Sequence, residues 1–404
     1  MPAYPLLDPA ALLDPHPTLH RMRAEDPVHW SDQLHAWVLT RYDDVAAALN
    51  DPRLSSKQLD VMLQYQLGGR DPAIVADYRR LVGGMMLLKD GDDHHRLRVL
   101  GNRGFTPSLL ENFRPVIQWV VDRLLDKAAA GGRMDIVRDL AQPFPAAIIA
   151  ELFNIPDDDQ PRFQAWADDV VKYFGGSLGD PDADARAANA GAIELERYFL
   201  AMHAKRGGKP GIDLMGLFIA GQQEGKLTAA EVCCQCVLLL NAGHVTTIDQ
   251  LSNAVYDLLT HPDQLTRLRA EPTLIRTAVE ELIRFNPAVC YTRRTAVEDV
   301  PLRGKTIRTG DLVYLGLAAA NRDPAVFPDG DRLDLGRKEN KHLSFGGGPH
   351  VCLGAGLARR ELEIGLTTLL RRFPALALDP AAAPVRRCES LVFRGFGTLP
   401  VRLA

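Results

Sequence analysis

The feature that most constrains the fold is a long proline-free stretch from Thr228 to Leu259. Thr228 and Glu231 form the T-x-x-E pattern of a capping box immediately before an apolar run. Good helix formers then continue to about Leu259, so the sequence predicts one helix of roughly 45 Å at 1.5 Å per residue. A helix of that length crosses a whole domain, and the rest of the chain must pack around it.

Most of the remaining chain also has helical patterning. From about Thr106 to Leu282, proline and glycine separate helical segments, and a helix from Thr273 to Phe285 ends before Pro287. Strand-like runs lie towards the two ends of the chain, and a helix at 43–49 follows the second of them; we expect strands at 27–30, 36–40, 300–307, 312–319 and 391–403. The predicted fold class is mainly α with small β-sheets (α+β).

The chain has 404 residues, which by length alone allows two or three domains. It contains no internal repeat, and its flexible-looking stretches at 175–184 and 205–211 do not separate compositionally different halves. We therefore expect a single domain over residues 1–404. The hydrophobic content of 46% and charged content of 24% exclude a disordered chain.

Charge and cysteine usage restrict partners and location. Lys and Arg total 47 against 51 Asp and Glu, so the net charge of −4 gives no reason to expect nucleic acid or an anionic membrane as a partner. The N-terminus has no basic region followed by a long apolar run, which argues against a signal peptide or membrane anchor. The six cysteines are too scattered for a disulfide framework, so we expect a cytoplasmic protein.

The most informative segment, at 345–361, is a glycine-rich loop that delivers Cys352 to the start of a helix. Free N–H groups and the positive end of the helix dipole stabilise a thiolate there. Taken alone, the segment also fits a buried structural cysteine. A phosphate loop would need a Lys-Ser/Thr ending that is missing, and a cysteine nucleophile would need a base that the nearby His350 does not establish.

The same segment resembles the haem-binding signature of the cytochrome P-450 family. The pattern F-x-x-G-x-x-x-C-x-G is met by Phe345, Gly348, Cys352 and Gly354. The resemblance implies the P-450 fold, with haem b between a long distal helix and a proximal cysteine-bearing loop. It also implies that Cys352 is the iron ligand, whose thiolate favours cleavage of the O–O bond.

Four further residues resemble the family's ligands for the haem propionates. His94 and Arg98 match an H-x-x-x-R pair and lie on one helix face. Arg294 resembles a third propionate ligand and His350 a fourth. Buried carboxylates need several donors, which fits four cationic or polar groups converging on one place.

Glu281 and Arg284 match the family's E-x-x-R motif. A lone Glu and Arg at this spacing would ordinarily be a surface ion pair. By resemblance, they are a buried structural pair that supports the proximal side. Sequence similar to that of the family extends from about Val28 to Gly395, so the resemblance covers nearly the whole chain.

The middle of the long helix resembles the oxygen-binding motif A-G-x-(D/E)-T, with Ala242, Gly243 and Thr246 as candidate catalytic residues on one face. On their own, such small residues indicate a helix-packing patch. Val245 stands where the family usually has an acid that helps to deliver protons. Three explanations for the missing acid remain. Water and Thr246 suffice to deliver the protons, a group of the substrate delivers them, or the reaction departs from ordinary hydroxylation. His244 lies about 200° from Thr246 around the helix, so we do not expect it to replace the acid.

The expected substrate pocket is mainly apolar, as is usual for small-molecule sites. Alternation along a strand places Thr292 and Cys290 on the face of Arg294, and Arg293 on the opposite face as a surface or packing residue. The other lining candidates, chosen by position, are Leu87, Leu88, Leu239, Val289, Leu391 and Val392. By resemblance, an acidic ferredoxin-type electron donor docks on a basic face formed by Arg96, Arg103, Lys341, Arg359 and Arg360, although each could equally be a solvated surface charge.

The resemblance implies a haem-thiolate monooxygenase that inserts one atom of O2 into an apolar small molecule of secondary metabolism. Because the haem domain uses the whole chain, electrons would come from a separate ferredoxin and reductase. One alternative is atypical family chemistry linked to Val245: a peroxide-driven reaction, nitration or oxidative aromatic coupling. An alternative of another class is a haem-thiolate binding or sensor protein without turnover.

Overall fold

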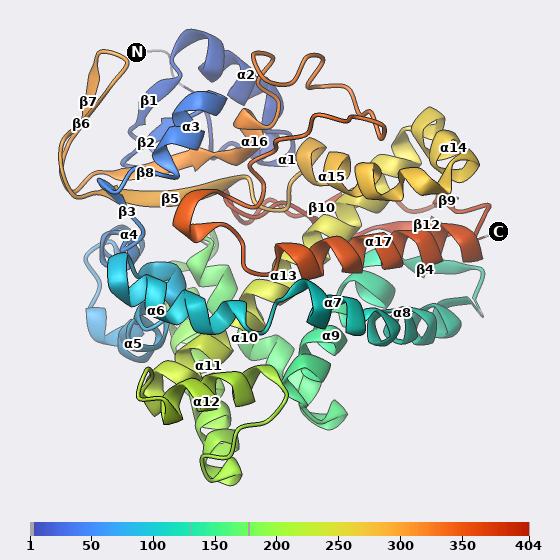
Figure 1. Ribbon diagram of the computed structural model, residues 1–404. Helices are drawn as coiled ribbons and strands as arrows, with labels where there is room; N and C mark the ends of the chain where they lie inside the picture. The colour runs from blue at the N-terminus through green and yellow to red at the C-terminus, as the bar shows by residue number, and fades with distance from the viewer. Residues whose placement is uncertain (1–3, 130, 177, 404) are drawn as a thin grey trace.

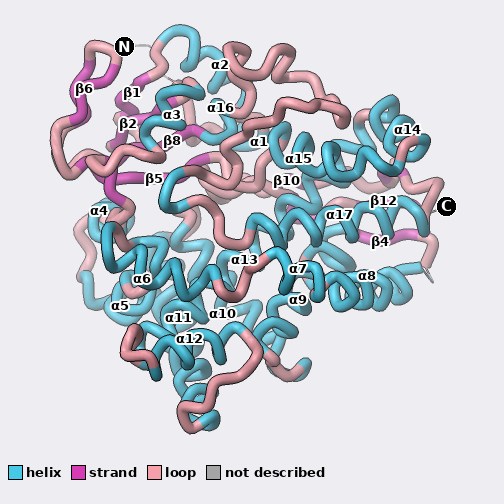
Figure 2. Tube along the Cα trace, in the orientation of Figure 1, coloured by secondary structure: helices cyan, strands magenta, loops and turns pink. Residues whose placement is uncertain are grey.

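The computed structural model describes residues 4–129, 131–176 and 178–403. Helices form most of the molecule, and the main sheet lies at one side, close to the N-terminus (Figures 1 and 2). The helices are α1 (Pro9–Leu13), α2 (His16–Glu25), α3 (Tyr42–Ala48), α4 (Leu59–Leu67), α5 (Ala76–Gly83), α6 (Gly91–Asn102), α7 (Pro107–Asn112), α8 (Arg114–Ala129), α9 (Pro143–Phe153), α10 (Gln160–Phe174), α11 (Pro181–Arg206), α12 (Leu214–Gln223), α13 (Ala229–Thr260), α14 (Pro262–Ala270), α15 (Ile275–Phe285), α16 (Leu317–Ala320) and α17 (Ala355–Arg372).

Helix α13 is the predicted long helix and crosses the middle of the molecule (Figure 1). The Thr228 hydroxyl accepts from the Glu231 N–H at 3.2 Å, and a Glu231 carboxylate oxygen accepts from the Thr228 N–H at 2.8 Å, so the capping box is confirmed. The helix packs against α9, α10, α11, α12, α15 and α17. It is long and apolar enough to cross a membrane, but 78% of its most apolar window is buried inside the protein, as in the core helix of a globular fold.

The main sheet has the strand order β1-β2-β8-β5-β3. Its strands are β1 (Val28–Ser31), β2 (Ala36–Leu39), β3 (Leu54–Ser55), β5 (Tyr291–Ala296) and β8 (Leu312–Gly316). Strands β2 and β8 pair in parallel and the other neighbours are antiparallel. The sheet therefore joins the two ends of the chain, as the expected strand positions implied.

Three smaller sheets complete the β-structure. They are a three-stranded sheet of β4 (Arg133–Asp135), β12 (Pro400–Arg402) and β9 (Ala377–Leu378), and the pairs β6 (Val300–Leu302) with β7 (Lys305–Ile307) and β10 (Val385–Arg386) with β11 (Phe396–Thr398). The mainly α fold class with small sheets is therefore confirmed.

Three of the stretches expected to form strands differ in detail: 300–307 folds as the pair β6 and β7, 391–403 holds β11 and β12, and 312–319 holds a shorter strand. β8 ends at Gly316, and Leu317–Ala320 forms the short helix α16, where a continued strand was expected to Ala319. A Cβ at Gly316 would lie 2.7 Å from the Leu39 carbonyl oxygen, so only glycine fits beside β2 at this point. The three alanines that follow favour a helix over a strand.

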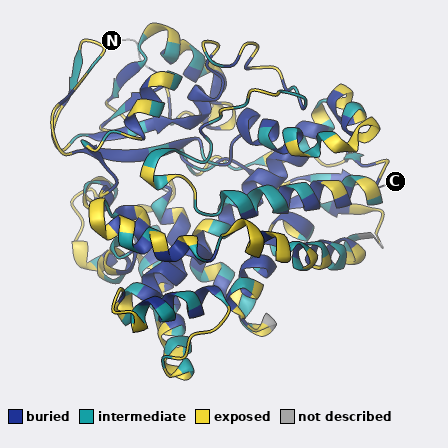
Figure 3. Ribbon diagram, viewed as in Figure 1, coloured by how far each residue is buried: buried dark blue, intermediate teal, exposed yellow. Residues whose placement is uncertain are grey.

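The core consists mainly of two large apolar clusters, and α13 contributes to both. One cluster joins its N-terminal half, through Leu239 and Leu240, to α9, α10, α11 and α12. The other joins its C-terminal half to α8, α15 and α17. Burial is accordingly deepest along this helix and β5 (Figure 3). Since α13 is fixed on both sides, the residues in its middle are held in place.

Candidate active site

The cysteine loop is shaped by glycines and by one backbone hydrogen bond. The Cys352 N–H donates to the Phe345 carbonyl at 2.8 Å, which closes the loop just before α17. Gly348 has φ +62°, and a Cβ there would lie 2.7 Å from the Leu49 carbonyl oxygen. A side chain at Gly348 would therefore be strained twice, by backbone conformation and by contact.

Cys352 is exposed as a residue, yet protein atoms surround its thiol closely enough that burial raises the pKa of the thiol. This combination is expected of a group that lines an interior space. The Gly354 and Ala355 N–H groups and the Arg98 and Arg359 charges act in the opposite direction and favour the thiolate. An added Cβ at Gly354 would meet nothing within 4 Å, so the loop leaves room beside the sulfur.

Two histidines from distant parts of the chain meet near this loop. The rings of His94, on α6, and His350 have centroids 4.0 Å apart, and His350 Nε2 lies 3.5 Å from an Asp90 carboxylate oxygen. Burial would raise the pKa of Asp90, but hydrogen bonds from His350, Ser55 and the Ser56 N–H hold it well below its usual value. Burial, together with the His350 charge, lowers the pKa of His94 to about 4.

Arg98 and Arg294 add positive charge to this histidine cluster. The Arg294 side chain donates to the Arg293 carbonyl at 2.8 Å, and Arg98 donates to the Asn102 side chain at 3.2 Å. Burial lowers the pKa of both guanidinium groups. Within the described residues, neither forms a salt bridge with a carboxylate. Two partly desolvated arginines without an anionic partner fit a ligand that brings its own carboxylates.

The middle of α13 presents a short accessible stripe in an otherwise buried helix. Ala242 is exposed and Thr246 is partly exposed, and the Thr246 hydroxyl donates to the Ala242 carbonyl at 2.8 Å. Gly243 behaves differently, because a Cβ there would lie 2.6 Å from Ile149 on α9. Gly243 therefore lets the neighbouring helix α9 approach closely, and its role beside Ala242 stays a prediction.

The predicted E-x-x-R residues are fully buried. Arg284 Nε and one of its terminal nitrogens each donate to a Glu281 carboxylate oxygen at 2.7 Å, and neither side chain is exposed. Arg284 also donates to the carbonyls of Asn321 and Gly330. The pair thus ties α15 to the segment that precedes the cysteine loop, and it is not an ordinary surface ion pair.

The residues expected to line the substrate pocket differ in how far they are buried. Leu88, Leu239 and Val392 are buried, whereas Leu87 is 38% exposed. The Arg294 guanidinium lies 3.4 Å from the Thr292 hydroxyl, so those two share a face as expected.

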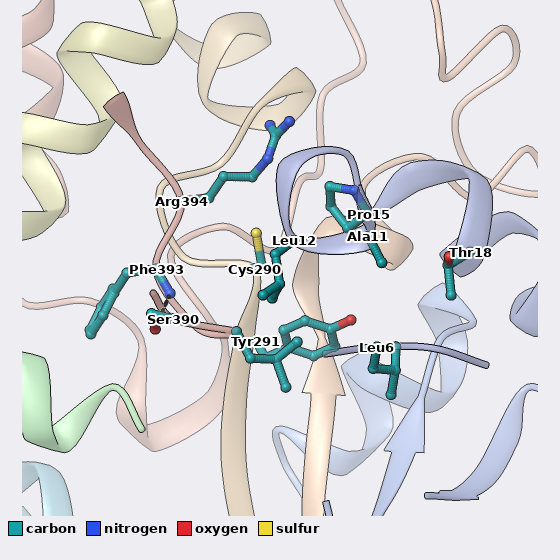
Figure 4. Close-up of a pocket in the computed structure, with 11 residues that line it drawn as sticks. Leu6, Ala11, Leu12, Pro15, Thr18, Cys290, Tyr291, Ser390, Phe393 and Arg394 are labelled. Atoms are coloured by element: carbon teal, nitrogen blue, oxygen red, sulfur yellow. Dashed lines mark hydrogen bonds between the residues drawn. The ribbon is translucent and has the colours of Figure 1, made fainter. Parts of the chain in front are cut away.

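Cys290 does not share that face. It packs with Tyr4, Leu6 and Tyr291, because it precedes the first residue of β5 and the strand alternation does not extend to it. Together with Leu391 it lines a recess between the N-terminal segment and the C-terminal loop (Figure 4). Arg293, expected to be a surface or packing residue, is buried and donates to the Phe174 carbonyl at 2.5 Å.

Most members of the expected basic face have acidic partners. Salt bridges join Arg96 to Glu231, Arg103 to Glu224, Arg359 to Glu280 and Arg360 to Glu111, while Lys341 is exposed. The net positive potential of this face is therefore weaker than its arginine content suggests.

Sequence reasoning missed two buried carboxylates, Glu361 and Asp249, and one half-buried carboxylate, Asp90. Glu361 on α17 accepts from the Thr247 hydroxyl at 3.5 Å, Asp249 on α13 pairs with Arg387, and Asp90 pairs with His350. The only signal for Asp249 and Glu361 in the sequence was an acid on the apolar face of a helix.

Comparison with known proteins places this chain in a family. The family model for Cytochrome P450 matches residues 193–393. The chain is 37% identical to the biotin biosynthesis cytochrome P450 of Bacillus subtilis over 397 residues, with 96% of each chain covered. It is also 37% identical to the cytochrome P450 monooxygenase PikC of Streptomyces venezuelae over 411 residues, covering 98% of this chain and 94% of the relative.

Among solved structures, the cytochrome P450 enzyme CxnD, described for C–S bond formation in chuangxinmycin biosynthesis, is similar. Its TM-score is 0.87 at 34% identity, with 97% of this chain and 94% of that chain covered. The fold and these relatives define a haem-thiolate oxidoreductase. This chain belongs to the cytochrome P450 family, whose cofactor is haem b.

The residues present fit that cofactor. Cys352 offers a sulfur with two backbone N–H donors, Arg98 and Arg294 offer unpaired cations for propionates, and Gly354 leaves open space beside the sulfur. When bound, thiolate-ligated haem supplies the activation of dioxygen. The exposed Ala242 leaves the middle of α13 free of bulk on that face.

Proposed function

We propose that this enzyme hydroxylates or epoxidises an apolar small molecule of secondary metabolism in the cytoplasm, with electrons from a separate ferredoxin and ferredoxin reductase. The observation that carries the proposal is the accessible stripe of Ala242 and Thr246 on a buried helix, together with the exposed residue Cys352. The biosynthetic names of the similar proteins support the substrate class.

The protein's own residues perform three tasks in this proposal. Cys352 holds its sulfur against the backbone N–H groups of Gly354 and Ala355. His94, Arg98, Arg294 and His350 bind the propionates and fix their orientation. Apolar residues such as Leu239 and Val392 exclude water and orient the substrate, so that one position faces the reacting centre.

The electron donor is proposed to dock near the cysteine loop through Lys341, Arg359 and Arg360. Because most of the arginines there already have acidic partners, we expect a short-lived complex whose association rate falls with ionic strength. Reduction by a ferredoxin should therefore slow several-fold as salt is raised and on Lys341→Glu. A reduction rate that is indifferent to both changes argues against this docking face.

The thiolate assignment is tested by the absorption spectrum of the reduced protein with carbon monoxide. Wild type should give the red-shifted Soret band of thiolate ligation, and Cys352→Ser should lose it. Cys388→Ser, at another exposed cysteine, is the matched control and should keep the band. A wild-type spectrum typical of histidine ligation would contradict the proposal.

Substrate identity is approached by screening fatty acids, steroids and macrolides for displacement of haem-bound water, followed by turnover with a ferredoxin system. Product formation separates an enzyme from a non-turnover binding or sensor protein. A compound that shifts the spectrum but is never converted, although the protein is reduced, would favour the sensor.

A second candidate is atypical family chemistry, such as oxidative coupling, a peroxide-driven reaction or nitration. It is favoured by Val245, which is buried and cannot hold or orient a proton, and by the similarity to an enzyme of C–S bond formation. Product analysis under 18O2 distinguishes hydroxylation or epoxidation, which places one labelled oxygen in the product, from coupling, which places none; a nitro group in the product would itself identify nitration.

A further inference from the structure

Helix α13 carries one acid close to the position where the family's acid is missing. Asp249 lies four residues after Val245 and three after Thr246, so all three lie on adjoining parts of one helix face. Side chains on a helix lean towards its N-terminus. The Asp249 carboxyl therefore leans over the turn that contains Val245 and Thr246.

The surroundings of this carboxyl are unusual. Asp249 is 0% exposed, and Arg387 donates to Oδ1, whereas the buried Oδ2 has no hydrogen-bond partner among the residues that the structure describes. A Cβ at Gly395 would collide with Oδ1, so the C-terminal loop needs glycine to leave space for the carboxyl. A buried carboxylate oxygen without a donor costs stability, and packing gives no reason for its presence.

Two charged groups from other elements act on Asp249. Arg387 comes from the loop after β10, and Asp168 comes from α10. Burial raises the pKa of Asp249 to about 6, against the effect of Arg387 and with a further increase from Asp168. Burial likewise raises the pKa of Asp168 to about 6 although its side chain is 53% exposed, and Asp168 Oδ1 lies 3.8 Å from His244 Nε2. Both carboxyls can therefore exchange protons near neutral pH.

We propose that Asp249 is the proton donor of this enzyme, in place of the acid absent at Val245. The proton leaves the Asp249 carboxyl, passes through one water to Thr246 Oγ1, and the hydroxyl's own proton moves on into the pocket. Arg387 stabilises the carboxylate that remains, and Asp168 returns a proton from solvent. The proposal rests on the dioxygen chemistry of the family and requires no particular substrate.

The geometry of Thr246 suits this role. Its hydroxyl hydrogen points to the Ala242 carbonyl at 2.8 Å, so the oxygen's lone pairs are free to accept from another donor. Residues three apart on a helix have Cβ atoms about 5–6 Å apart, a gap that one water can bridge.

Glu361 is the competing donor. It is buried, burial raises its pKa to about 8, and it accepts from the Thr247 hydroxyl at 3.5 Å. Thr247 lies about 100° from Thr246 around the helix, so Glu361 approaches a different face. Glu361→Gln is therefore the variant that distinguishes the two donors.

The first test is infrared difference spectroscopy of the haem-loaded protein as a function of pH. The wild-type minus Asp249→Asn spectrum should contain a protonated carboxyl band with a midpoint near pH 6. Arg387→Gln should move that midpoint upwards, because the arginine favours the carboxylate. Asp257→Asn, at another buried acid of α13, is the control and should leave this band in place. No titrating band, or a midpoint that Arg387→Gln does not move, overturns the proposal.

The second test measures hydrogen peroxide released per dioxygen consumed, without substrate and with a plant-type ferredoxin and reductase. Slow proton delivery releases peroxide, so Asp249→Asn should raise the ratio towards one. The double variant Val245→Glu/Asp249→Asn should return it to the wild-type value. Asp257→Asn and Glu361→Gln should not change it.

A ratio unchanged in Asp249→Asn, or raised equally by Glu361→Gln, overturns the proposal. So does a wild type that already releases one peroxide per dioxygen, since no relay is then working. The thiolate spectrum of each variant with carbon monoxide separates loss of this relay from failure of the haem-thiolate centre itself.

Discussion

The imidazole of His350 packs against that of His94 with ring centroids 4.0 Å apart and a tilt of 33° between the ring planes, although the two residues lie 256 positions apart in the sequence. His350 is held in place by Asp90, which lies just before α6, and His94 lies in the first turn of that helix. The cysteine loop is thereby fixed to α6. The arrangement brings the residues expected to bind haem propionates to one side of Cys352.

Haem retention should depend on Arg294. Replacing it by alanine removes a buried cation that forms no salt bridge with a described carboxylate, although the charge of Asp90 acts on it, and a charge-assisted hydrogen bond contributes about 1.5–3 kcal/mol. We expect Arg294→Ala to lower haem affinity at least about tenfold, measured as haem transfer to an apoprotein acceptor. The exposed Arg308, which pairs with Asp299, provides the control Arg308→Ala. Equal haem loss in both variants would contradict this assignment.

The buried pair of Glu281 and Arg284 should be essential for stability. Removing Arg284 takes from the buried Glu281 its two shortest hydrogen bonds and leaves it with Arg337, and breaking a buried pair costs about 3–5 kcal/mol. We expect Arg284→Met to lower the free energy of unfolding by that amount in a denaturant titration. Arg308→Ala breaks an exposed pair and should cost about 1 kcal/mol or less. Similar costs for the two variants would show that burial of the pair does not matter.

Stability should fall in mild acid because His244 is buried in its neutral form. Burial lowers its pKa to about 4, whereas the unfolded chain titrates near 6.5. The unfolded state thus binds a proton first, so this stabilisation is complete above pH 6.5 and is lost as the pH falls towards 4. This stabilisation is on the order of 3 kcal/mol.

His244→Leu should flatten this part of the pH profile of unfolding, measured by chemical denaturation. His95→Leu changes an exposed histidine and serves as the control. An unchanged slope in His244→Leu would show that His244 does not titrate differently in the folded and unfolded states.

Gly348 should tolerate no side chain. Gly348→Ala places a Cβ 2.7 Å from the Leu49 carbonyl oxygen at a backbone φ of +62°. We expect a loss of stability of about 1–3 kcal/mol and a lower yield of haem-loaded protein. Gly310→Ala also has a positive φ but open space, so it separates backbone strain from contact. If the two variants lose the same amount of stability, the contact with Leu49 is unimportant.

The parts of this protein that the sequence could predict are those specified by local patterns. The capping box at Thr228 and Glu231 defines the start of α13, and the glycine-rich loop places Cys352 just before a helix. Helix and cap formation depend on residues within a few positions, and the spacing of the haem signature is equally local.

Only the tertiary structure decided which distant side chains meet. The strand alternation that would have placed Cys290 beside Arg294 depends on where β5 begins. Gly243 packs against Ile149 of α9, which lies almost one hundred positions away in the sequence. The pairing of Asp249 with Arg387 has the same origin. Burial, ion pairs and pKa values arise from contacts between segments that are remote in the chain, and no local pattern encodes them.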